Sequence, residues 1–102
     1  DNDFLQSTIF RYELISMIVK KWNGKVIFIP EIIDETSNYY SKMFKISSST
    51  KELTKNNDNF YFEDLSNAIE MNKNNFLDKM HFSETGSGQF SELVLNIIKK
   101  YI

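Results

Sequence analysis

Lys25-Val26-Ile27-Phe28-Ile29-Pro30 is the stretch that decides the fold. It is a short, continuous apolar run that contains β-branched residues, and it follows an Asn23-Gly24 turn. A run of this kind predicts a β-strand that is buried on both faces, as in a parallel sheet. Pro30 marks the end of the strand, where a missing N–H costs little.

A helix is predicted before this strand, from about Phe4 to Trp22. Lys20 and Lys21 lie in its last turn, where cations interact favourably with the negative end of the helix. Gly24 is expected to adopt the left-handed conformation that ends the helix. Four apolar residues at helical spacing form one face of this helix: Ile15, Ile18, Val19 and Trp22.

The segment after Pro30 predicts a polar loop at residues 31–36, with Ser37 as a candidate cap for a helix through Phe44. The hydroxyl-rich run at residues 47–50 is weakly helical and is expected to interrupt that helix. A second strand is predicted at Asn59–Glu63, because consecutive aromatic residues favour a strand over a helix.

The last part of the chain predicts a long connection with a short helix at residues 66–71, then an amphipathic terminal helix. Its apolar positions recur at helical spacing: Phe90, Leu93, Val94, Ile97, Ile98 and Tyr101. Alternation of helices and strands predicts an α/β fold with a parallel sheet. Two parallel strands do not form a stable sheet alone, so residues 1–102 are expected to be a single partial domain. Another chain, another part of a precursor or an oligomer partner would supply the missing strands.

Composition narrows the class of protein. The chain has 102 residues, 41% of them hydrophobic, and a net charge of −2, which fits one domain with a core. Its charges are interspersed and give no electrostatic case for nucleic acid or an anionic membrane. Its apolar runs are too short to span a bilayer, and the absence of cysteine excludes disulfides without fixing a compartment. The start, Asp1-Asn2-Asp3, lacks an initiator methionine and suggests a processed product or a piece of a longer protein.

One pair of residues has a spacing that permits acid–base chemistry without being diagnostic of it. His81 is the only histidine, and Asp78 lies three residues before it. A histidine can take a proton from a serine hydroxyl through one ring nitrogen while an aspartate holds the other. The pair follows the last predicted strand, and sites in open α/β sheets gather at the carboxyl ends of strands.

The block Asp78-Lys79-Met80-His81-Phe82-Ser83-Glu84-Thr85-Gly86, followed by the terminal helix, resembles the last conserved block of the SGNH (GDSL-type) hydrolases. The resemblance implies the C-terminal part of a flavodoxin-like, doubly wound fold and a serine ester hydrolase without metal or organic cofactor. It assigns His81 as the base and Asp78 as the residue that orients it. The implied substrate is an ester or acetylated compound: a small molecule, a lipid or a glycan.

The chain departs from this family in its other blocks. It contains no G-D-S block, so the nucleophilic serine would come from outside it. Asn2-Asp3 could end a G-x-N-D block, in which case Asn2 would be an oxyanion donor. Ser87, between Gly86 and Gly88, is a poor nucleophile candidate, because it is not in a G-x-S-x-G motif and does not follow a strand.

Other interpretations stay open. The chain could be a non-catalytic α/β remnant or a binding and assembly module, with His81 an ordinary surface or core residue. A flavodoxin-like phosphate binder is weaker, because there is no glycine-rich strand-to-helix loop. The acidic cluster of Glu31, Asp34 and Glu35 suits either a Mg²⁺ site or a solvated loop, and the loop is the better expectation.

Overall fold

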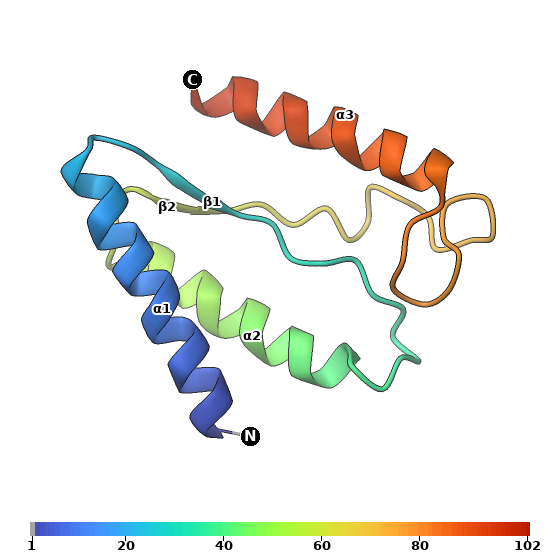
Figure 1. Ribbon diagram of the computed structural model, residues 1–102, viewed down its shortest axis with the longest axis horizontal. Helices are drawn as coiled ribbons and strands as arrows, with labels where there is room; N and C mark the ends of the chain where they lie inside the picture. The colour runs from blue at the N-terminus through green and yellow to red at the C-terminus, as the bar shows by residue number, and fades with distance from the viewer. Residues whose placement is uncertain (1) are drawn as a thin grey trace. The chain divides into compact units, whose positions relative to one another are not determined.

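The computed structural model describes residues 2–102, and helices alternate with strands along the chain (Figure 1). The order is α1 (Asn2–Lys21), β1 (Val26–Phe28), α2 (Tyr40–Glu52), a 3₁₀ turn (Leu53–Lys55), β2 (Phe60–Phe62) and α3 (Glu84–Tyr101). β1 and β2 pair in parallel, with Val26 opposite Phe60 and Phe28 opposite Phe62. The described residues therefore form three helices and a small, open, two-stranded parallel sheet, which confirms the mixed α/β class.

The chain divides into two compact units. Unit 1 comprises the chain up to Ile29 together with Ser41–Glu63, and it holds α1, both strands and nearly all of α2. Unit 2 comprises Pro30–Tyr40 and Asp64–Ile102, and it holds α3. Asp78 and His81 both belong to unit 2.

Unit 1 packs α1 against its sheet. The Tyr12 ring lies 5.4 Å from the Phe28 ring, which in turn stacks on Phe62 at 5.8 Å. Ser16 is buried and donates a hydrogen bond to Asn59 Oδ1 at 2.9 Å, while Asn59 Nδ2 donates to the Ser16 carbonyl at 2.9 Å. Because both buried polar groups are satisfied, this pair fixes α1 against the residue that precedes β2.

The four apolar residues that share one face of α1 lie mostly outside the core. Ile15, Ile18 and Trp22 are exposed, and Val19 is half-buried. The Ser16–Asn59 pair and the Tyr12–Phe28 contact set the rotation of the helix, and they turn a different face inward. The prediction that β1 is buried on both faces is wrong, because all three residues are half-buried in a strand with one neighbour.

The end of α1 uses Asn23 rather than Gly24 as its left-handed residue. Asn23 has φ of 61°, and no glycine has positive φ among the described residues. Gly24 N–H donates to the Val19 carbonyl at 3.0 Å and Asn23 N–H donates to the Lys20 carbonyl at 2.9 Å, which is the Schellman pattern. Gly24 is needed for space, since a Cβ there would lie 2.7 Å from Val19 Cγ1.

Replacement of Asn23 by glycine is expected to stabilise the protein by about 0.5–1 kcal/mol, because glycine adopts the left-handed conformation without the strain of a Cβ. Asn23→Ala should instead destabilise it, since alanine has the Cβ and lacks the side-chain amide that favours this conformation. Urea unfolding followed by circular dichroism measures both. A lower midpoint for Asn23→Gly than for the parent would contradict the prediction.

α2 runs without interruption through residues 47–50, so the predicted break is wrong. Thr50 is fully buried and its hydroxyl donates to the Ile46 carbonyl one turn earlier, at 2.6 Å. A hydroxyl that is bonded inside its own helix no longer competes with the helix, and burial of Ile46 adds apolar packing. Ser37 accepts from Tyr39 N–H at 3.2 Å in the turn ahead of α2, rather than capping the helix at its start.

Unit 2 has its own core of Ile32, Ile69 and Phe76, with half-buried apolar residues of α3 packed against it. The Phe82 ring bridges the loop and the helix, 4.9 Å from Phe76 and 5.0 Å from Phe90. The predicted terminal helix is confirmed, with Ser83 as its N-cap. The short helix predicted at residues 66–71 is absent: this segment forms turns, one of them closed by Ser66 N–H on Asp64 Oδ1 at 2.8 Å. No helix in residues 2–102 has the length and apolarity needed to cross a membrane.

Candidate active site

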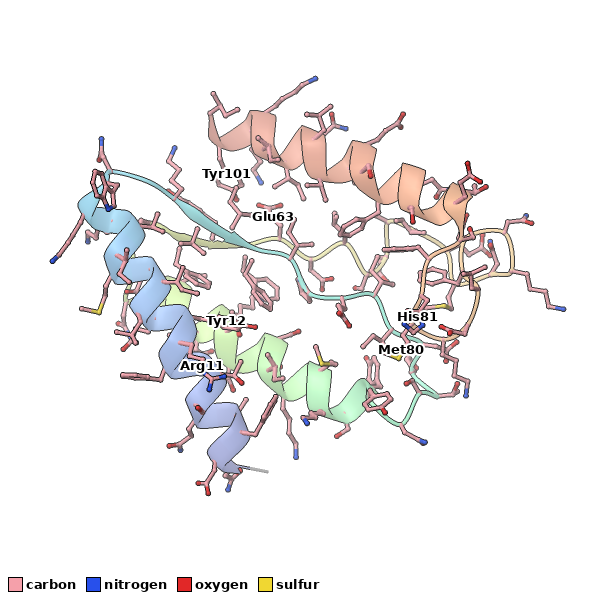
Figure 2. All side chains as sticks on the ribbon, viewed as in Figure 1. Arg11, Tyr12, Glu63, Met80, His81 and Tyr101 are labelled. Atoms are coloured by element: carbon pink, nitrogen blue, oxygen red, sulfur yellow. The ribbon has the colours of Figure 1, made fainter. Side chains whose placement is uncertain are left out.

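The Asp78–His81 pair lies on a loop that is closed at its base. Phe76 and Phe82 form an antiparallel bridge, and Leu77 N–H donates to the His81 carbonyl at 2.8 Å. The rings of Phe76 and Phe82 also pack against each other, which adds an apolar contact at the base of the loop. The closed base leaves residues 78–80 as a short tip, and Figure 2 shows His81 and Met80 on this loop ahead of α3.

The base of the loop is anchored on α3 through Asn75 and Gly86. Ser83 N–H donates to the Asn75 carbonyl at 2.9 Å, and the Ser83 hydroxyl donates to the Asn74 carbonyl. The same Ser83 oxygen accepts from Gly86 N–H at 3.1 Å. A Cβ on Gly86 would lie 1.9 Å from the Asn75 carbonyl oxygen, so only glycine allows α3 to approach this closely. The resemblance placed a glycine here, and its physical role is close contact rather than a left-handed turn.

Asp78 makes two kinds of contact. Its Oδ1 accepts from the backbone N–H of Met80 at 2.9 Å and from that of His81 at 2.8 Å. Its carboxylate also faces His81 Nδ1, at 2.8 Å from Oδ2 and 3.0 Å from Oδ1. The carboxylate therefore caps the turn and orients the imidazole at once. Because an ionised carboxylate only accepts hydrogen bonds, this contact places a proton on Nδ1 of His81.

The charge of Asp78 is stabilised by these donors. The Met80 amide, the His81 ring and the His81 amide together hold the pKa of Asp78 below its usual value. The side chains of His81 and Asp78 are 66% and 56% exposed. No hydrogen-bond partner of His81 Nε2 occurs within residues 2–102, so this nitrogen is available to an incoming group.

The structure predicts an acid-sensitive loop. A carboxylate whose pKa is lowered by folding contributes stability above its unfolded-state value, and this stability is lost as the pH falls through the lowered value. We therefore expect the loop to stay ordered down to about pH 4, the ordinary aspartate range, and to loosen below it. Carboxyl ¹³C and amide ¹H NMR titrations of Asp78, Met80 and His81 measure this. Titration of Asp78 at or above the value found in the urea-unfolded chain would contradict it.

Unit 2 has two hollows along the segment 32–40, and the smaller one adjoins this loop. One, of about 270 Å³, is lined by residues 36–39 and 78–80, so it includes Asp78 itself. The other, open and of about 790 Å³, is lined by residues 32–36, Tyr40 and residues 66–71. Two hydrogen bonds connect the segment 34–36 to Lys79 of the loop. Asp34 N–H donates to the Lys79 carbonyl at 2.8 Å, and Lys79 Nζ donates to the Thr36 carbonyl at 3.3 Å.

The acidic cluster has a local structural role. Asp34 Oδ1 accepts from the Thr36 hydroxyl at 2.6 Å and from the Thr36 amide at 2.8 Å, and these two bonds lower the pKa of Asp34. No group of three or more histidine, cysteine or carboxylate side chains that could hold a metal ion occurs within residues 2–102. Asp34 and Glu35 line the larger hollow as carboxylates.

The remaining candidates, Ser87 and Asn2, belong to the two terminal helices. Ser87 is exposed in the first turn of α3, and its N–H donates to the Ser83 carbonyl at 2.9 Å. Asn2 is exposed at the first residue of α1, in unit 1. Asn75 was not predicted from sequence, although it is buried and its backbone N–H, backbone carbonyl and both side-chain polar atoms are hydrogen-bonded. Its only signal is its place in an asparagine-rich loop, which suggests a turn but not a buried anchor.

Comparison of the chain with protein-family models, with curated proteins and with solved structures found no match.

Proposed function

We propose that this chain supplies the Asp78–His81 part of a Ser-His-Asp triad in an ester hydrolase of SGNH type. The observation that carries the proposal is the 2.8 Å contact between His81 Nδ1 and the Asp78 carboxylate, with Asp78 itself held by two backbone amides. A triad needs this orientation, because the imidazole must keep one nitrogen protonated and offer the other to the serine.

The proposed chemistry runs through His81 Nε2. A serine from the completing segment attacks the ester carbonyl, and Nε2 takes the hydroxyl proton as the covalent acyl-enzyme bond forms. The imidazolium then gives that proton to the leaving alkoxide, and a water molecule repeats the cycle to release the acid. Asp78 stabilises the imidazolium through its ion pair with Nδ1. Donors to the oxyanion would come from the same segment as the serine.

The two hollows of unit 2 suit the alcohol or acyl part of a substrate. The larger one is lined by the carboxylates of Asp34, Glu35 and Glu70 and by no lysine, arginine or histidine. Such a lining disfavours anionic substrates by charge repulsion. It is compatible with an uncharged ester or acetylated compound, whether a small molecule, a lipid or a glycan.

The sheet supports the proposal that another strand-bearing segment completes the domain. β1 and β2 pair only with each other among the described residues, so each strand has no strand neighbour on its other side there. Two strands fall short of the three or more that a self-supporting sheet needs. An N-terminal segment or a second chain would extend it toward the doubly wound, flavodoxin-like sheet.

Active-site labelling tests this function. The chain is purified from its native source together with any segment that completes its sheet, and it is treated with a fluorophosphonate, which bonds to activated serines. Labelling that disappears when His81 is replaced by asparagine is the expected result. A folded assembly that takes up no probe would count against the hydrolase.

A binding or assembly module is the second candidate, and the exposure of the pair favours it. His81 and Asp78 are both more than half exposed, and no serine hydroxyl within residues 2–102 is bonded to His81. In this case Asp78 would only cap the loop. A structure of the complete assembly separates the two, because the hydrolase requires a serine Oγ within hydrogen-bond distance of Nε2.

A further inference from the structure

α1 carries a second apolar face besides the one that packs on the sheet. The inward side is marked by Tyr12 and Ser16, which contact Phe28 and Asn59 (Figure 2 labels Tyr12). Phe10, Leu14 and Met17 lie on another side of the helix and are 60%, 40% and 57% exposed. Large apolar side chains gathered on one helix face mark an interaction surface more often than scattered ones do.

These residues belong to a seam with alternating spacings of four and three. The seam consists of Asp3, Ser7, Phe10, Leu14, Met17 and Lys21. Its first residue is acidic and its last residue is basic. This spacing, close to 3.5 residues, is the one that lets two helices pack along their length at a shallow angle.

The seam is complementary to itself when a second copy is reversed. An antiparallel copy sets Phe10 against Leu14, the small Ser7 against the long Met17, and Asp3 against Lys21. Each pairing occurs twice by two-fold symmetry, as in an isologous interface. Antiparallel packing also joins the positive end of each helix dipole to the negative end of the other. A parallel copy would instead oppose Asp3 to Asp3 and Lys21 to Lys21.

We propose that the chain self-associates through this seam, with α1 packed antiparallel against α1 of a second copy. The occupant is the chain itself because the seam matches its own reverse in both charge and side-chain size. The proposal is independent of the hydrolase, since it uses none of the residues of the loop at 78–81.

Sedimentation equilibrium of the full chain tests the association. The parent is expected to be a dimer at micromolar concentration, and Leu14→Glu is expected to be a monomer, because it would place two charges in the centre of the seam. Leu95→Glu is the matched control, as Leu95 is similarly exposed on α3 and outside the seam. Circular dichroism confirms that both variants keep their helices. The proposal would be overturned if the parent were monomeric or if both variants weakened the dimer equally. In the first case the seam would be the contact surface of a different partner.

Charge exchange tests the antiparallel orientation. Lys21→Glu is expected to weaken dimerisation about tenfold, because it turns two attractive pairs into repulsive ones of the strength usual at surfaces. The double variant Asp3→Lys with Lys21→Glu should recover the parent dissociation constant. Failure of the double variant to recover it would show that Asp3 and Lys21 do not face each other.

Discussion

Gly86→Ala is expected to destabilise unit 2 by about 3 kcal/mol, at the upper end of the cost of overpacking. The added Cβ would lie 1.9 Å from the Asn75 carbonyl oxygen and 2.8 Å from its carbon. Both are backbone atoms, so no side chain can rotate away to make room. Because Asn75 also accepts from Ser83 N–H, any shift there disturbs the base of the loop that holds Asp78 and His81.

Gly88→Ala is the matched control for this prediction. It lies two residues further along the same helix, and a Cβ there would meet nothing within 4 Å. Alanine should therefore stabilise the helix by about 0.5–1 kcal/mol through its better propensity. Urea unfolding of both variants, with amide exchange to localise the change, measures the difference. Equal stability of the two alanine variants would refute the close contact.

His81→Asn in the assembled hydrolase is expected to lower kcat by about 10⁶, the order seen when a triad loses its histidine. Asparagine cannot accept the serine proton and return it to the leaving group. Asp78→Asn should produce a large loss as well, because the amide NH₂ can donate to Nδ1 of His81 and favour the tautomer whose Nε2 cannot accept the serine proton. Steady-state hydrolysis of an activated acetate ester gives kcat and KM for each variant.

Asp64→Asn provides the control for the aspartate. Asp64 closes a similar turn, accepting from Ser66 N–H at 2.8 Å, but within residues 2–102 it makes no hydrogen bond to His81. It should leave kcat within about twofold of the parent, since surface substitutions of this kind have small effects. If His81→Asn kept kcat within tenfold of the parent while retaining its fold, the proposed role of His81 would be wrong.

The Asp78–His81 pair shows which contacts of the site can be predicted from the local sequence. Three residues of separation suffice for an aspartate to contact a histidine in a short turn, so Asp78 and His81 could be paired from sequence alone. The two backbone amides that Asp78 accepts from lie in the same turn, so they are also local contacts. The closure of the loop by Phe76 and Phe82 does not follow from this spacing, because it depends on how the chain returns on itself.

The α/β order, the parallel sheet and the two long helices at the ends of the chain could all be predicted from the sequence. These follow from apolar periodicity and short β-branched or aromatic runs, which are local properties. Three features became clear only from the tertiary structure. They are the face of α1 that packs inward, the continuation of α2 through its serines, and the close contact of Gly86 with Asn75. Each of these depends on a partner distant in sequence or on burial: Asn59 for Ser16, Asn75 for Gly86, and the surrounding core for Thr50. Periodicity reports that a helix has an apolar face, but only the positions of those partners decide which face is buried.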